Sequence, residues 1–547
     1  MRRQWRFQLS QTAGALAAIA TILVAFVAIA TDRLADYPRL ATDESWLMTV
    51  SHTFLTSGYL GADMFAGFFN ADSHWFVNPP AQHFYHAASF ALVGESVAAA
   101  RLASVVAAVV LLLSATSLAW RWWGALAAVV TCLLLVLLPS GLTATVDVPL
   151  YDYARSARYD IAATALLWLA LLLLHELLTA PSHLKALLLG LVCGLATLTQ
   201  WFGIAAPVTV VVAWLWLVRR KDRLRADLLP GDRRARQIAV AAGIGFLIAI
   251  VPYAVYVVAF RDDAAAQISA LHATRFRAIN PVGVLENVLS EPRRYEALFE
   301  PRASGSWLFV AAIVPALVYL VYRARSSGEV GDGLALIALG VTFAVLALFD
   351  VTKAPIYALA LVPAGALVLA LGARDLLRYG RTMATARNRA AVAIVAVGVL
   401  AVVNLGIQSY DEQSRRAWAI EPYHQTEDRL QAAVPQTGIA LGSIRWGWAF
   451  RDRPYAAELA LWHWWQPGST ARRPPAESLA LTLADAEITH VIVDSDLRES
   501  LGAYPEWLRD EFGRILAECA TVVDSWTAGP YGSLEVYRLS DNYAACD

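Results

Sequence analysis

Long runs of apolar residues, almost free of charge, recur along the chain up to residue 410. A helix that crosses a membrane needs about 20 consecutive apolar residues, so each run of suitable length predicts one span. The run 186–218 is too long, because at about 1.5 Å per residue it would reach roughly 50 Å, against a hydrocarbon core of about 30 Å. Since Thr199-Gln200-Trp201-Phe202-Gly203 reads as a turn, we predict two short helices here and eleven spans in all. The runs are 13–31, 102–120, 122–146, 161–174, 186–218, 238–260, 303–322, 333–349, 354–373 and 390–410.

Basic residues fall in alternate loops between these runs, which predicts an orientation. The N-terminus carries Arg2, Arg3 and Arg6, and the loops 219–237 and 374–389 carry eight and five basic residues. Loops rich in lysine and arginine stay on the cytoplasmic side of a membrane. The segments then expected outside the plasma (inner) membrane are 32–96, 147–160, 261–306 and the tail 411–547.

The first run allows a second interpretation. Ala28-Ile29-Ala30, after a basic start, resembles a signal-peptidase site. The apolar run is long for a signal peptide, so a retained first helix is favoured. Cleavage would leave the orientation of the other spans unchanged.

The pattern changes after residue 410, where short strand-like and helix-like pieces alternate. We therefore predict two domains: a transmembrane domain over 1–410 and a small α/β domain over 411–547. The strand-like pieces are Gly438–Ser443, His490–Asp494 and Leu534–Leu539, and the helix-like pieces are 476–486 and 505–517. The tryptophans of this tail form either a sugar-stacking surface or its core, and the core is slightly favoured. They are Trp446, Trp448, Trp462, Trp464 and Trp465.

Composition agrees with a membrane protein. Of the 547 residues, 58% are hydrophobic and only 16% are charged, whereas a soluble domain carries roughly 25% charged residues. The net charge of −1 indicates no nucleic-acid partner. The four cysteines form no metal-binding cluster; Cys519 and Cys546 either pair in an oxidising compartment or stay as free thiols.

Candidate chemistry begins with Asp43 and Glu44, about a dozen residues after the first span. Adjacent carboxylates at a membrane surface can supply a general base and a polar positioning group. They can equally begin a helix, with Thr42 or Asp43 as the N-cap and Glu44 in the first turn. The residues alone leave both roles open.

Histidines in the same segment offer a metal site as one alternative. His74, His83 and His86 could bind a metal together with Glu44, but ordinary interfacial histidines are favoured. Pro79-Pro80 predicts a helix start, and 81–94 then reads as an amphipathic helix on the membrane surface.

Further charges stand at the outer ends of later spans. Arg155, Arg158 and Asp160 precede one span, where they could clamp a phosphate and orient a sugar hydroxyl or form a simple interfacial ion pair. Lys353 precedes a late span with Tyr357, contrary to the positive-inside trend. It either snorkels to the surface or meets a lipid phosphate, which is favoured.

The third outer segment is basic and could bind an anionic headgroup, although ordinary solvated charge is equally consistent. Its polar residues include His272, Arg275, Arg277, Glu286, Glu291, Arg293, Arg294 and Tyr295.

Taken in order, these features resemble a known superfamily. The chain has Asp-Glu after the first span, Pro-Pro before a juxtamembrane helix, Gly94-Glu95-Ser96 followed by Arg101, Ser-x-Arg-x-Asp before a span, and Lys-x-x-x-Tyr-x-Leu-x-x-x-Pro in a late span. Over about residues 30–375 it resembles the GT-C superfamily. The resemblance is to the dolichyl-phosphate-mannose protein mannosyltransferases and lipid A aminoarabinose transferases (glycosyltransferase family 39/83-like).

The resemblance implies an α-helical polytopic membrane protein of the GT-C fold that acts as a hexosyl- or pentosyltransferase. It implies a polyprenyl-phosphate sugar donor and a glycan, lipid or protein acceptor approached from outside. It also implies Asp43 as catalytic base with Glu44 beside it, and Asp160 with Arg158 as a second acidic and basic pair. Lys353 and Tyr357 match the side of the lipid phosphate. Tyr159 replaces a frequent proline, and the late motif has fewer aromatic residues than usual, which leaves the sugar and the acceptor open.

The implied chemistry suits these residue types. Sugar transfer passes through an oxocarbenium-like state, and a phosphate leaves without a strong general acid. One carboxylate can deprotonate the acceptor while cations stabilise the leaving phosphate, and a single displacement inverts the anomeric carbon. The key loop lacks Asp-x-Asp, which favours metal independence, with a divalent metal as the alternative.

Three other functions are compatible with such a topology. A transporter or flippase is disfavoured because no pair of interrupted spans occupies matching halves of the chain. A scaffold that recruits a partner through its tail and an oligosaccharide polymerase or en bloc transferase are the others. Because the matched motifs all precede residue 375, the tail is expected to be separable from the chemistry and to affect acceptor choice.

Overall fold

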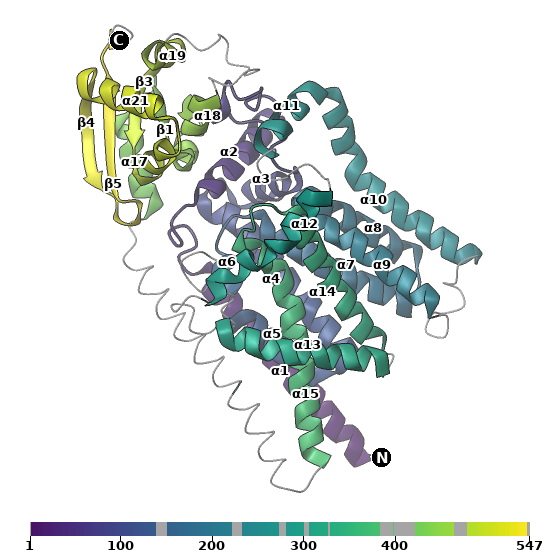
Figure 1. Cartoon of the computed structure of the whole chain (residues 1–547). Coiled ribbons are helices and arrows are strands. Elements are labelled where there is room, and N and C mark those ends of the chain that lie inside the picture. Colours follow the sequence, from purple (N-terminus) through teal and green to yellow (C-terminus); the bar gives the residue numbers. More distant parts are fainter. Residues whose placement is uncertain are drawn as a thin grey trace.

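The computed structural model describes residues 2–137, 150–220, 232–272, 281–299, 306–326, 329–382, 398, 422–463 and 478–543. A bundle of long helices forms the larger part, and a small domain with a β-sheet packs at one end of it, beside α2 and α11 (Figure 1). The N-terminus lies at the opposite end of the bundle (Figure 1). The architecture is therefore the predicted one, an α-helical membrane domain with a C-terminal α/β domain.

Helices account for all of the regular structure described before residue 422. The α-helices are α1 (Arg2–Thr31), α2 (Thr42–Ser57), α3 (Ala81–Val93), α4 (Val97–Trp123), α5 (Ala125–Leu137), α6 (Leu150–Tyr153), α7 (Tyr159–Thr179), α8 (His183–Thr199), α9 (Ala205–Arg219), α10 (Arg233–Ala259), α11 (Arg261–His272), α12 (Pro281–Leu289), α13 (Ser306–Ser326), α14 (Val330–Phe349) and α15 (Val362–Thr382). The 3₁₀ helices are η1 (Asp63–Phe65), η2 (Trp201–Ile204), η5 (Glu291–Phe299) and η6 (Pro355–Leu361).

Among the described residues, seven helical segments are long and apolar enough to cross a membrane. They correspond to α1, α4, α7, η2 with α9, α10, α14 and η6 with α15, and two shorter apolar helices are α5 and α8. The predicted run 303–322 forms α13. The predicted run 390–410 lies outside the described residues apart from residue 398, so the count of eleven spans stays a prediction.

The long run 186–218 is divided at the predicted turn. α8 ends at Thr199, Gln200 is extended, and its side-chain oxygen accepts a hydrogen bond from the Trp201 backbone N–H at 2.9 Å. Gly203 then passes so close to α8 that a Cβ would lie 1.9 Å from the Ala196 carbonyl oxygen. Only glycine fits this approach, which brings η2 back against the end of α8.

Small residues also set the contact between α8 and α10. A Cβ at Gly190 would lie 1.8 Å from the Ala242 carbonyl oxygen, and one at Gly245 would lie 2.0 Å from that of Leu187. Helices packed inside a membrane approach most closely where such small residues face each other. The two helices therefore pack as a pair through their backbones.

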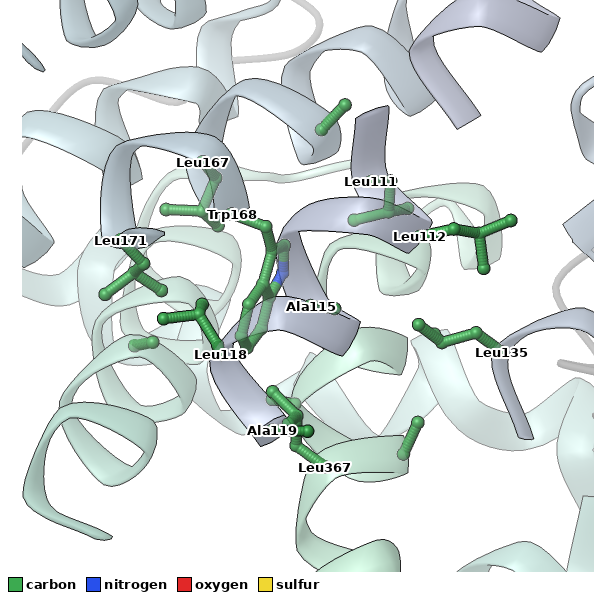
Figure 2. Packing of buried hydrophobic residues seen from close by; sticks show 14 of the residues in the cluster. Leu111, Leu112, Ala115, Leu118, Ala119, Leu135, Leu167, Trp168, Leu171 and Leu367 are labelled. Atoms are coloured by element: carbon green, nitrogen blue, oxygen red, sulfur yellow. The ribbon is translucent and has the colours of Figure 1, made fainter. Parts of the chain in front are cut away.

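The core of the bundle is built around α4 and α7. Trp168 of α7 packs in one cluster with Leu118 of α4 and Leu171 of its own helix, and Leu135 of α5 and Leu367 of α15 belong to the same cluster (Figure 2). The side chain of Trp168 is buried. This packing fixes the ends of α4 and α7, which carry the polar residues described below.

The C-terminal domain is a five-stranded mixed sheet with the order β2-β1-β3-β5-β4. β1 pairs in parallel with β2 and β3, whereas β5 pairs antiparallel with β3 and β4. The strands are β1 (Ile439–Gly442), β2 (Tyr455–Ala457), β3 (Ile488–Val493), β4 (Ala520–Thr527) and β5 (Ser533–Leu539). The helices are α17 (Tyr423–Ala433), η7 (Ile444–Phe450), α18 (Glu458–His463), α19 (Leu479–Asp485), α20 (Ser495–Gly502), α21 (Glu506–Glu518) and η8 (Gly529–Tyr531).

The three predicted strands and both predicted helices of the tail are present as β1, β3, β5, α19 and α21. Trp446 and Trp448 are buried, as the core interpretation expects. The side chains of Trp462, Trp464 and Trp465 lie outside the described residues. Cys519 is disulfide-bonded, whereas Cys132 and Cys193 are buried free thiols.

The sheet domain and the outer segment after α1 share one hydrophobic core. Leu47, Met64 and Phe90 belong to the same cluster of buried residues as Trp448 and Tyr531. Two further hydrogen bonds cross the contact: the Ser45 hydroxyl accepts from the Trp448 N–H at 2.9 Å, and the Tyr531 hydroxyl accepts from the Leu40 N–H at 3.0 Å. Removing the domain would expose this shared core, and the expected separation of the tail from the chemistry stays a prediction.

Candidate active site

The start of α2 positions the Asp43-Glu44 pair. Ala41 is the N-cap residue of α2. Its backbone N–H donates to Glu44 Oε2 at 2.9 Å, so the side chain of Glu44, the third residue of the helix, satisfies the N–H group of the cap residue. Glu44 therefore lies in the first turn as expected, but neither Thr42 nor Asp43 is the cap. The Asp43 carboxylate is left for other contacts.

The Glu44 carboxylate is fully buried, and both of its oxygens accept hydrogen bonds. Its two carboxylate oxygens form a bidentate ion pair with Arg101, and Oε1 also accepts from the Ala157 N–H at 2.7 Å. With the bond from Ala41, the carboxylate accepts four hydrogen bonds. The predicted substrate-binding role of Glu44 does not fit this environment; the residue positions the start of α2 instead.

The segment from Gly94 to Arg101 explains how Arg101 reaches Glu44. Gly94 ends α3 with a positive φ of 90°, and Ser96 caps α4 by accepting from the Ala99 N–H at 3.1 Å. Arg101 follows one turn into α4, and its Nη1 also donates to the Leu34 carbonyl at 3.0 Å. The motif thus turns the chain sharply between α3 and α4 and directs one arginine into the interior.

Asp43 meets Arg158 and Asp160 from the start of α7. Arg158 forms an ion pair with Asp43 through Nη1, and its Nε lies 2.9 Å from Asp160 Oδ2. The Asp43 side chain is 37% exposed, whereas Asp160 is buried. Burial alone would lower the pKa of Arg158, but the neighbouring carboxylates raise it well above its usual value. Arg158 therefore stays cationic between the two acids.

The remaining oxygen of Asp160 faces the turn after α8. Gln200 lies beside Asp160, yet Asp160 Oδ1 and Gln200 Nε2 are buried without a hydrogen bond to any described residue. Buried polar groups normally have partners. Because the Gln200 side chain acts on Asp160 as a hydrogen-bonding neighbour, these two atoms are close to pairing with each other, and Gln200 is a residue that the sequence indicated only as part of a turn.

Tyr357 joins the same end of the bundle. Its ring packs edge-on against Trp201 and close to Phe202, with centroid distances of 5.5 and 5.7 Å, and its hydroxyl is within electrostatic range of Tyr159. Tyr159 also interacts with Asp43. Tyr357 and the three charged residues are therefore all neighbours of Tyr159.

Lys353 lies in a buried cluster of four charges. Its Nζ is 2.8 Å from Glu291 Oε2 and donates to the Ala347 carbonyl at 3.0 Å. Arg294 pairs with Glu291 at 2.7 Å and with Asp350 at 2.8 Å. The lysine does not snorkel, because it is only 4% exposed. Glu291 and Arg294 are buried too, so they are not solvated loop charges.

Two other predicted site residues are not part of the Asp43 cluster as described: Arg155 lies elsewhere, and the side chain of His272 is outside the described part. Arg155 is buried, donates to the Asp32 carbonyl oxygen and packs over the Tyr37 ring at 4.8 Å. This position ties the segment between α6 and α7 to the residue that follows α1. His272 is the last residue of α11, and its side chain lies outside the described part.

The histidine-based metal site does not form among the described residues. No three potential metal ligands gather there: His74 pairs with Asp263 at 2.8 Å, while His83 and His86 are buried in α3. Burial lowers the pKa of His83 to about 4. It lowers the pKa of His86 to about 3, to which His83 also contributes. Both rings are therefore neutral near pH 7.

The sheet domain also reaches the start of α2. Thr42 Oγ1 donates to Asp496 Oδ2 at 3.5 Å, and Arg445 pairs with Asp496. The sequence offered no sign of this contact, which joins residues 454 positions apart.

A cavity of about 660 Å³ lies at the other end of α2, between α3, α8 and α10. Asp43 and Gly58 are 15 residues apart, or about 22 Å along the helix at 1.5 Å per residue, so this cavity does not contain the Asp43 cluster. Its aromatic wall includes Phe54, Tyr59, His74, Phe84, Tyr253, Tyr256 and Phe260.

Neither a family model nor a curated protein matches the sequence. Solved structures do match. ArnT from Cupriavidus metallidurans bound to undecaprenyl phosphate is 14% identical with a TM-score of 0.57, covering 95% of this chain and 98% of that one. The apo oligosaccharyltransferase of Archaeoglobus fulgidus is 13% identical with a TM-score of 0.55, covering 96% and 74%. The same archaeon's AglB with an inhibitory peptide and a dolichol-phosphate has 12% identity and a TM-score of 0.52, with the same coverage. These likenesses show the fold.

Proposed function

From the GT-C fold that this chain shares with ArnT and AglB, we propose that it is a membrane glycosyltransferase. It transfers a sugar from a polyprenyl-phosphate-linked donor to an acceptor on the outer face of the membrane. The observation that carries the proposal is the Asp43–Arg158–Asp160 cluster at one end of the bundle, with a partly exposed carboxylate on Asp43. ArnT with undecaprenyl phosphate and AglB with a dolichol-phosphate support the class of donor.

The proposed reaction is a single displacement. Asp43 accepts the proton of the acceptor hydroxyl or amine as that atom bonds to the anomeric carbon. The bond from this carbon to the phosphate oxygen breaks with its electron pair, which leaves the lipid phosphate and an inverted glycoside. Arg158 orients Asp43 and supplies positive charge near the leaving phosphate. Asp160 holds Arg158 from the buried side.

Lys353 and Tyr357 form the proposed donor side. Lys353 now pairs with Glu291, so a donor phosphate would take the place of this carboxylate beside the ammonium group. Tyr357 is buried against Trp201 and Phe202 and interacts with Tyr159, so its proposed role is to border the donor site from inside the bundle. The four-charge cluster contains two acids and two bases, and an added phosphate is balanced only if Glu291 moves away or takes a proton.

The proposed location is the plasma membrane with the sheet domain outside. The disulfide at Cys519 supports this side, because disulfides persist in oxidising compartments. The packing of the domain against the segment 32–96 places both on one side of the bundle. ArnT and the archaeal oligosaccharyltransferase, the solved structures named above, are transferases and do not support the transporter alternative.

The proposed function is tested by mass spectrometry of lipid-linked sugars and of cell-envelope glycans, with and without this protein. We expect one polyprenyl-phosphate sugar to accumulate and one envelope glycan to lose a single residue when the protein is absent. Unchanged pools of both would contradict the proposal. The glycan that changes also identifies the acceptor.

A further inference from the structure

A second cavity, with a polar lining, lies at the end of the bundle remote from Asp43. α4 connects the two ends: Arg101 and Trp123 are 22 residues apart, or about 33 Å at 1.5 Å per residue, close to the hydrocarbon thickness of a bilayer, about 30 Å. The cavity has a volume of about 800 Å³ and is formed where α4, α13 and α15 meet. This is the end that the basic loops predict to face the cytoplasm.

The lining of this cavity is basic. It contains four arginines but only two carboxylates, Glu329 and Asp375. Arg378 is exposed and makes no ion pair with any residue in the described part of the chain. Arg121 is half exposed and pairs at its rim with Glu176. The arginines are Arg121, Arg323, Arg374 and Arg378.

The inner wall of the cavity is held by a buried network. Trp123 Nε1 donates to Asp332 Oδ1 at 2.9 Å, and Arg323 pairs with both Asp332 and Asp375. Arg374 donates to the Trp123 carbonyl at 3.0 Å. Asp332 is fully buried. Because these charges satisfy one another, the wall keeps its shape, whereas Arg378 and Arg121 are the exposed arginines of the lining.

Aromatic residues place the opening at the level of lipid headgroups. Trp120, Trp122 and Tyr379 line the cavity beside the arginines, and tryptophan and tyrosine gather at membrane interfaces. The neighbouring face of α13 is apolar and exposed at Val318 and Tyr322. A phosphate in the cavity would therefore have arginines around it and an apolar helix face beside it for acyl chains.

We propose that this cavity binds the phosphate headgroup of an anionic phospholipid from the leaflet opposite the Asp43 cluster. Basic pockets between helices bind such headgroups, and each arginine near an anionic surface contributes about 1 kcal/mol, or roughly fivefold in affinity. Arg378 and Arg121 contact the phosphate, and the buried network holds the wall. The inference is independent of the glycosyltransferase proposal.

The test is native mass spectrometry of the full chain with phosphatidylglycerol or phosphatidylcholine. We expect phosphatidylglycerol to bind more tightly, and Arg378→Gln to weaken that binding about fivefold. Arg236→Gln is the matched control, since Arg236 is an exposed arginine on α10 outside the cavity. Its lipid binding should equal that of the wild type.

Two outcomes would overturn the proposal. Equal phosphatidylglycerol binding by Arg378→Gln and Arg236→Gln would show that the cavity does not select the lipid. Displacement of the lipid by millimolar glycerol 3-phosphate would show that the occupant is a soluble phosphate rather than a phospholipid. A thermal-shift measurement of both variants without lipid checks that each is folded.

Discussion

Arg101 and Glu44 form a fully buried bidentate ion pair, with Nε to Oε1 and Nη2 to Oε2 distances of 2.9 Å. The pair joins the first turns of α4 and α2, and the Ala157 N–H adds the segment before α7 to the same carboxylate. Three parts of the chain are thereby fixed around the residue next to Asp43. The position of the proposed base depends on a pair that has no contact with solvent.

Removing one partner of this pair should destabilise the protein strongly. Loss of one member of a buried ion pair typically costs about 3–5 kcal/mol, because the other charge is left without a partner. We expect Glu44→Gln and Arg101→Met each to lower the midpoint of thermal unfolding in detergent. The double variant should be more stable than Glu44→Gln alone, since it leaves no buried charge unpaired. Wild-type stability of Glu44→Gln would show that Arg101 finds another partner.

Substitutions of Lys353 and of Glu291, which form one ion pair, should change donor affinity in opposite directions. If Lys353 binds the donor phosphate, Lys353→Ala should weaken donor binding roughly tenfold to hundredfold, the range for a hydrogen bond to a charged group. Glu291→Gln should tighten it, because the phosphate then meets no competing carboxylate. The measurement is binding of a polyprenyl phosphate in nanodiscs, with thermal unfolding of both variants as the control. Unchanged affinity in both would limit the pair to a structural role.

The membrane helices could be predicted because the apolar runs are local signals. The division of 186–218 was also visible, since Gln200 interrupts the apolar pattern. The strands β1 and β3 are largely buried, and β5 alternates buried with more exposed positions; all three were predicted. By contrast, β2 has only three residues and β4 is an exposed edge strand with polar positions. Short or half-exposed strands leave too weak a pattern to be recognised.

The contacts of the site were less predictable. The residues Asp43, Arg158 and Asp160 were named from their place at span ends, and the structure brings them together. The partners of Glu44 and Lys353 were not foreseen, because Arg101 and Glu291 are 57 and 62 residues away. Nothing local in a sequence records which distant charge fills a buried position.

The buried carboxyl of Glu458 should make the stability of the sheet domain depend on pH. Burial raises the pKa of its carboxyl to about 8, to which Asp494 and Asp496 contribute. The folded protein then keeps the proton while the unfolded chain loses it near its usual pKa. The protonated carboxyl therefore makes its full contribution to the free energy of unfolding below about pH 4.5, and this contribution is lost as the pH rises to 8.

Glu458→Gln should remove this dependence, since glutamine does not titrate. Each pKa unit is worth about 1.4 kcal/mol, which limits the effect to about 5 kcal/mol. We expect the full-chain variant to unfold at a higher temperature than the wild type at pH 8, and the difference to vanish near pH 4.5. Scanning calorimetry across this range measures it. A difference that is constant with pH would place the pKa of Glu458 close to its usual value.

Topology gives a prediction that needs no enzyme assay. With eleven spans and the N-terminus inside, a reporter that is active only in the cytoplasm should be silent when fused after Asp547. The same reporter placed in the basic loop 219–237 is the control and should be active. A bright signal from the C-terminal fusion would put the sheet domain, and with it the Asp43 cluster, on the cytoplasmic side.

The central claim is that Asp43 accepts a proton from the acceptor. The direct measurement is turnover and donor binding of Asp43→Asn in nanodiscs with a polyprenyl-phosphate sugar and the acceptor identified from the envelope glycans. Asparagine keeps the shape of the side chain but cannot take the proton, so turnover should fall by about 10²–10⁴-fold while the donor still binds. Asp36→Asn is the control, because Asp36 pairs only with Arg33 at 3.8 Å among the described residues and should keep its activity. Near-wild-type turnover of Asp43→Asn would contradict the account and make Asp160 the next candidate.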